Sequence, residues 1–98
     1  MWAIEITGSG ADAKLQPAQR ARPEAREGEV LIRVAAAGVN RPDVLQRLGL
    51  YPLPPDANPL PGLEVAGEIV QIGAGVREWN TGDRVMALTH GGGYAEYC

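Results

Sequence analysis

The sequence predicts a mostly β domain that contains one short helix. Short runs of alternating apolar residues recur along the 98-residue chain, and glycine or proline separates them. Only residues 40–49 place apolar residues at helical spacing behind a good capping residue. Because no βαβ unit, in which a helix connects two parallel strands, appears in the chain, we expect no nucleotide-binding domain within these residues.

Composition is that of one small globular domain. A chain of this length buries roughly 60–65% of the surface that it exposes when unfolded, which is enough for one core. The formal net charge of -3 gives no electrostatic reason to expect nucleic acid or a membrane surface as a partner. Cys98 is the only cysteine, so no intrachain disulfide can form and we expect a cytoplasmic protein. No apolar run has the length of a membrane span or the pattern of a signal peptide.

Three segments in the first part of the chain are expected to be strands. Residues 2–7 alternate and end at a glycine-rich turn. Residues 14–21 form a second strand, which Pro17 confines to an edge because proline cannot donate to a ladder. Residues 29–37 alternate most regularly and end in small alanines. The residues expected on one face of this strand are Val30, Ile32 and Val34.

A helix and a proline-rich loop follow these strands. Asn40 suits the N-cap, Asp43 favours the positive end of the helix, and Gly49 ends it. Residues 50–61 hold five of the eight prolines and are expected to form an extended surface loop, where binding groups are often found. Further strands are expected at about 63–73, 82–89 and 93–98.

Two glycine-rich segments resemble nucleotide-binding motifs but lack their context. Gly73-Ala74-Gly75 has Glu78 where a dinucleotide fingerprint requires a third small residue, and no helix follows it. Gly91-Gly92-Gly93 has no lysine and no helix after it. Both are expected to be turns in which glycine supplies positive φ angles. His90, the only histidine, is expected to be a solvated turn residue.

The order of motifs from residue 62 to residue 85 is the most specific feature of the chain. Gly62-Leu63-Glu64 begins a strand, Gly67 interrupts it, a Gly-x-Gly turn follows, and Gly82-Asp83-Arg84-Val85 begins the next strand. This order resembles the signature of the medium-chain dehydrogenase/reductase superfamily. Its zinc-binding members have histidine in place of Leu63 and cysteine in place of Asn40.

Neither of these two side chains supplies the thiolate or imidazole that zinc prefers. The resemblance therefore implies the zinc-independent quinone oxidoreductase branch, with no metal. A single cysteine also excludes the structural zinc lobe that the alcohol dehydrogenases carry.

This resemblance implies a GroES-like, partly open antiparallel β-barrel with one short helix. Residues 1–98 would form the N-terminal catalytic domain, apparently truncated before an α/β Rossmann domain. The full enzyme would be a homodimer that binds NADPH between its domains and reduces a quinone or another small electron-poor carbonyl. The fragment alone is expected to bind little or no NADPH and to take neither nucleic acid nor membrane as a partner.

The resemblance also suggests the site residues. Asn40 and Tyr51 are the expected catalytic residues, and both would contact the nicotinamide or the substrate. Gly67 would keep the cleft open near the cofactor, although a bulge or a close backbone contact is the favoured explanation of this glycine. Glu64 is either a catalytic carboxylate or a charge paired at a domain boundary, and Tyr94 could line the cleft.

Two other functions remain open at this point. A zinc-independent enoyl or alkenal reductase shares the fold and would act on a different conjugated carbonyl. A co-chaperone-like binding module without enzymatic activity has the same barrel, but it needs a mobile apolar loop. The proline-stiffened segment 50–61 suits that role poorly.

Overall fold

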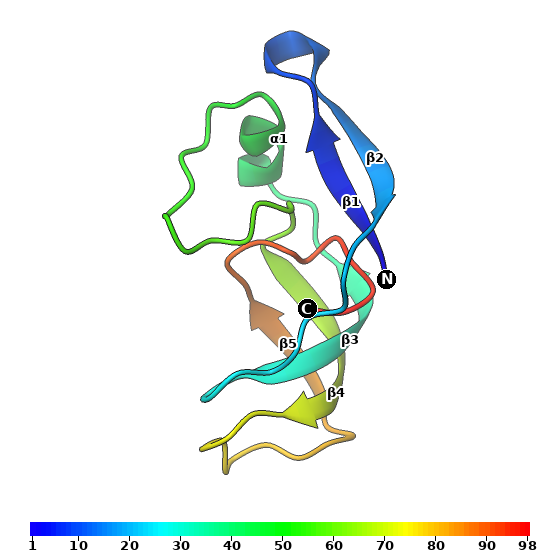
Figure 1. The fold of residues 1–98 in the computed structure, drawn as a ribbon, viewed down its shortest axis with the longest axis vertical. Helices are drawn as coiled ribbons and strands as arrows, with labels where there is room; N and C mark the ends of the chain where they lie inside the picture. The colour runs from blue at the N-terminus through cyan, green and yellow to red at the C-terminus, as the bar shows by residue number, and fades with distance from the viewer.

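The computed structural model describes all residues, 1–98, as two antiparallel sheets and one α-helix, which connects two strands of the second sheet (Figure 1). In the first sheet, β1 pairs with β2, and in the second the strand order is β3-β4-β5. The elements are β1 (Trp2–Thr7), a 3-10 turn (Gly10–Asp12), β2 (Lys14–Gln19), β3 (Val30–Ala37), α1 (Arg41–Arg47), β4 (Glu64–Ile72) and β5 (Arg84–Leu88).

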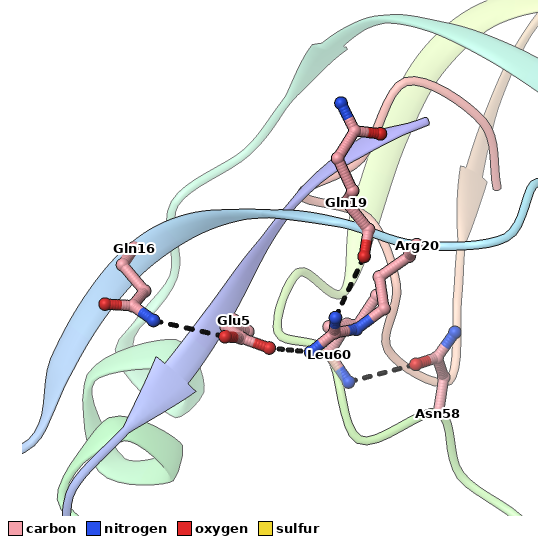
Figure 2. A network of polar contacts seen from close by, with 6 residues as sticks. All are labelled: Glu5, Gln16, Gln19, Arg20, Asn58 and Leu60. Carbon is pink, nitrogen blue, oxygen red and sulfur yellow. Dashed lines mark hydrogen bonds and ion pairs between the residues drawn. The ribbon is translucent and has the colours of Figure 1, made fainter.

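The β1–β2 ribbon has β2 at its outer edge, as the sequence predicts. Pro17 lies opposite Ile4 in the register, and β2 pairs with no other strand. On this ribbon the Glu5 carboxylate forms an ion pair with Arg20 and accepts a hydrogen bond from Gln16 Nε2 at 3.2 Å (Figure 2). These polar contacts join the two strands of the ribbon, whose exposed residues also include the apolar Trp2 and Leu15.

The β3–β4–β5 sheet carries the core. Ile32, Val65 and Ile69 are buried together, and the partly buried Val30 and Val34 pack against them. The expectation that alternate residues of the third strand face the core is confirmed. The ladder between β3 and β4 slips twice, between Leu31 and Ile32 and between Val34 and Ala36.

The expectation of a regular strand over residues 93–98 is wrong. This segment makes only two isolated bridges, at Ala95 and Tyr97. It turns from one sheet to the other, so that Ile4 N donates to the Tyr94 carbonyl at 2.7 Å and Ile32 N donates to the Cys98 carbonyl at 2.7 Å. The segment thus joins the two sheets (Figure 1), and the expectation of a mostly β, antiparallel fold with one short helix is confirmed.

Helix α1 begins and ends where its capping residues predict. Asn40 is the N-cap with extended backbone, and Gly49 follows the helix with φ of 76°. Asp43 and Gln46 are the buried residues of this helix. No helix in the structure has the length and apolar character needed to cross a bilayer.

The proline-rich loop is tied down at its C-terminal end by the three consecutive glycines. Residues 58–62 lie against residues 90–94, and four main-chain hydrogen bonds join them: Asn58 N to His90 O, Gly92 N to Leu60 O, Gly93 N to Gly62 O and Tyr94 N to Pro61 O. Gly91 and Gly92 have positive φ angles, as expected. All three glycines are buried because the loop backbone packs directly on them.

Candidate functional site

The pairing of β3 with β4 brings Asn40 to Glu64. Ala37 lies opposite Val65, and the Gly38 N–H donates to the Glu64 carbonyl at 3.2 Å. Asn40, two residues further on, then donates from Nδ2 to Glu64 Oε1 at 3.0 Å. The resemblance places Asn40 at one zinc-ligand position, and Glu64 directly follows the other. A direct hydrogen bond joins these two side chains.

A cavity of about 530 Å³ opens beside this pair. Its lining is apolar except for one carboxylate, that of Glu64. The lining residues are Ala36, Ala37, Gly38, Glu64, Val65, Ala66, Met86, Ala87 and Leu88. Such a lining suits a small neutral molecule, with the Asn40–Glu64 pair as the polar group at its side.

A second contact holds the backbone of Asn40. Asp43 is only 5% exposed, and its Oδ2 accepts hydrogen bonds from the Asn40 N–H at 2.9 Å and from the Tyr94 hydroxyl at 2.7 Å. Its other oxygen, Oδ1, is buried without a hydrogen-bond partner. Asn40 is thus held at the backbone by Asp43 and at the amide by Glu64.

Tyr94 is expected to make the stability of the chain depend on pH in the alkaline range. Burial raises the pKa of the Tyr94 phenol to about 12, and the hydrogen bond to Asp43 acts in the same direction. In the unfolded chain a tyrosine has a pKa of about 10. This contribution to stability is therefore complete below pH 10 and is lost as the pH rises to about 12.

Urea denaturation at several pH values between 9 and about 12 measures this effect. The free energy of unfolding of the wild type should fall more steeply across this range than that of Tyr94→Phe, which has no phenol to titrate at this position. Parallel pH profiles for the two proteins would show that Tyr94 ionises equally easily in the folded and unfolded states.

Tyr51 and Asn40 share no hydrogen bond in the structure, and the role of Tyr51 toward the nicotinamide stays a prediction. Tyr51 is half-buried in the proline-rich loop, forms no side-chain hydrogen bond and does not line the cavity. Gly67 lies in β4 opposite Val34 of β3, and a β-carbon at Gly67 would overlap the Arg33 carbonyl oxygen. The close backbone contact at Gly67 is therefore present, whereas its role toward a cofactor stays a prediction.

Some residues near the site gave a weak signal or none in the sequence. The sequence leaves the role of Glu64 ambiguous, and its contact with Asn40 and its position in the cavity lining place it in the site. Met86 and Leu88, at 87% and 85% exposed, line the cavity from the edge strand β5, and their alternation indicates only a strand. Tyr94 lies by a second cavity of about 390 Å³ and supports the site through Asp43.

Metal-ligating side chains do not gather anywhere in the structure. No group of three His, Cys, Asp or Glu side chains is close enough to hold an ion. Leu63, which the sequence resemblance places at a zinc-ligand position, is half-buried, and its carbonyl accepts a hydrogen bond from the Thr89 N–H at 2.8 Å.

Comparison with known proteins gives a consistent assignment of the domain. Residues 26–98 match the family model described as the alcohol dehydrogenase GroES-like domain. Among the relatives are a mouse synaptic vesicle membrane protein VAT-1 homolog-like (38% identical) and a spinach chloroplastic quinone-oxidoreductase homolog (42%). They align with 98% and 99% of this chain.

A solved structure agrees with these relatives. A mycobacterial protein in complex with NADPH superposes on all of this chain with a TM-score of 0.81 at 34% identity. The chain covers 23% of the mouse relative, 31% of the spinach relative and 30% of the mycobacterial chain. It therefore spans less than a third of the length of each of these proteins.

Proposed function

Because this chain belongs to the alcohol dehydrogenase GroES-like domain family, we propose that it is the substrate-binding domain of an NADPH-dependent oxidoreductase that reduces quinones. The quinone-oxidoreductase homolog from spinach and the NADPH complex of the mycobacterial protein support this proposal. The electron acceptor would be a quinone or a related small conjugated carbonyl.

The observation that carries the proposal is the Asn40–Glu64 pair beside an apolar cavity. An oxidised quinone is uncharged and largely apolar, and its polar atoms are its carbonyl oxygens. The cavity supplies apolar walls, and the amide of Asn40 supplies a neutral hydrogen-bonding group at its side. No side chain of this pair looks like a strong general acid. Binding and orientation of the electron donor and the acceptor would therefore account for most of the catalysis.

NADPH would supply the reducing equivalents when it is bound. Asn40 fits the nicotinamide because this residue is exposed and its amide is held in place by the hydrogen bond to Glu64. Tyr51 would pack against the ring from the proline-rich loop, and Gly67 would leave room for it. We propose that the pyrophosphate is held by a separate nucleotide-binding domain. The homodimer and the cytoplasmic location stay predictions of the sequence.

A panel of acceptors tests the proposed substrate class. The complete enzyme should oxidise NADPH faster with small quinones than with enoyl thioesters or alkenals at equal concentrations. Reduction of the enoyl thioesters or alkenals alone would keep the oxidoreductase and reassign the substrate. A protein that oxidises no NADPH and elutes as a ring-shaped oligomer would instead favour a co-chaperone-like module.

Purified protein is expected to contain far less than one equivalent of zinc. Leu63 and Asn40 stand where the zinc-binding members have ligands, and a leucine side chain cannot bind the ion. Elemental analysis of the complete enzyme, purified without chelators, measures the metal content. Near-stoichiometric zinc would contradict the assignment to the zinc-independent branch. The variant Asn40→Cys/Leu63→His, which restores both ligand types, is the matched control for zinc uptake.

A further inference from the structure

The direction in which the Asn40 amide points is set by Glu64. Its nitrogen, Nδ2, donates to Glu64 Oε1 at 3.0 Å. Asp43 holds only the backbone of Asn40, because its Oδ2 accepts a hydrogen bond from the Asn40 main-chain N–H at 2.9 Å. Because a primary amide carries two N–H donors, one Nδ2 hydrogen remains for a ligand.

Glu64 is itself held in position. It is the first residue of β4, and its carbonyl accepts the hydrogen bond from the Gly38 N–H. Its side chain lies over Gly38 and occupies the space that a β-carbon there would fill, at 2.7 Å from Cγ and 2.6 Å from Cδ. The absence of a side chain at Gly38 thus allows the carboxylate to reach Asn40.

We propose that Glu64 is a positioning residue that keeps an N–H of Asn40, rather than its oxygen, available beside the cavity. The site would then take a ligand carbonyl oxygen as hydrogen-bond acceptor. This inference rests on the proposed function and deepens it, because a quinone oxygen gains negative charge during reduction and a fixed donor stabilises that charge. Without Glu64, the amide could turn over and present its oxygen, which repels a carbonyl oxygen.

Two substitutions of Glu64 test the orientation in the complete enzyme. Glu64→Ala removes the acceptor for Asn40, and kcat/KM for a small quinone should fall about 5- to 30-fold. Glu64→Gln keeps an acceptor oxygen, and kcat/KM should stay within about 3-fold of wild type. Glu68→Ala is the matched control on the same strand, because Glu68 pairs with Arg33 at 2.8 Å and takes no part in the site.

Exchanging the hydrogen-bond donor and acceptor between positions 40 and 64 separates the positioning role of Glu64 from a purely structural one. Asn40→Asp places a second carboxylate against Glu64 and should destabilise the protein. Adding Glu64→Gln restores a donor–acceptor contact in the opposite direction, so the melting temperature should recover. Turnover should not recover, because the aspartate side chain at position 40 has no N–H to donate to the ligand. Recovery of both stability and turnover would overturn the inference.

Gly38→Ala displaces the carboxylate while both partners remain. The new β-carbon would overlap the Glu64 side chain, so kcat/KM should fall as it does in Glu64→Ala. Combining the two substitutions should cause no further loss, since both act through the same contact. If Asn40→Ala lowers turnover but Glu64→Ala does not, the inference is wrong and the proposed function stands. If Asn40→Ala has no effect on quinone turnover, Asn40 has no catalytic role and the inference is wrong. Absence of quinone-dependent oxidation of NADPH by the wild type would instead overturn the proposed function.

Discussion

Replacing Gly62 by alanine is expected to destabilise the chain by about 3 kcal/mol or more, a large part of the total stability of a small domain. Gly62 has a φ angle of 102°, which costs a residue with a β-carbon about 1–3 kcal/mol. A β-carbon would also lie 2.5 Å from the Tyr94 nitrogen and 2.7 Å from Gly93 Cα. Since these are backbone atoms held by hydrogen bonds, the contact can be relieved only by separating residues 58–62 from residues 90–94.

Gly82→Ala is the matched control for this substitution. Gly82 has a similar φ angle, 96°, but a β-carbon added there would meet no atom within 4 Å. It should therefore cost only the backbone strain, about 1–3 kcal/mol. Urea denaturation followed by circular dichroism measures both proteins, and the difference between them is the cost of the close contact. Equal losses of stability would show that the contact between the two segments contributes nothing.

Replacing Asn40 by alanine is expected to lower kcat/KM of the complete enzyme for a small quinone by about 5- to 150-fold. The substitution removes a hydrogen bond to a partly buried ligand, which is worth about 1–3 kcal/mol. Tyr51→Ala should cost less, about 0.5–1.5 kcal/mol, if the ring only packs against the nicotinamide. Steady-state oxidation of NADPH with the same quinone measures both variants.

The structural effect of removing Asn40 must be separated from the catalytic one. Asn40 is also the N-cap of α1, and loss of a cap costs about 0.5–2 kcal/mol of stability. Asn40→Ser keeps a capping side chain but lacks the amide, so it should restore the melting temperature and not the activity. Wild-type turnover in Asn40→Ala at unchanged stability would mean that this residue only caps the helix.

Local signals in the sequence were sufficient for most of the elements. Strand β3 follows from its alternating branched residues, and α1 follows from Asn40 at its start and Gly49 at its end. The segment 93–98 could not be predicted in the same way. Its backbone bonds first to β1 and then to β3, and these partners lie more than 60 residues earlier in the chain.

The site depends on contacts that sequence patterns do not contain. Asn40 and Glu64 are 24 residues apart, and they meet because the register of the β3–β4 ladder places Ala37 opposite Val65. A change of register by one residue would turn Glu64 to the other face of the sheet. Tyr51 lies in a loop without strand or helix, where no periodic pattern indicates the direction of a side chain. Its role therefore rests on the resemblance alone.

Oxidation of NADPH by the complete enzyme, with a small quinone and a zinc chelator present, tests the central claim most directly. The rate of absorbance loss at the reduced-nicotinamide band is recorded with and without the quinone and with and without the chelator. We expect turnover that requires the quinone and is unchanged by the chelator. Absence of quinone-dependent oxidation, or its loss on chelation, would contradict the assignment of this domain to a zinc-independent quinone reductase.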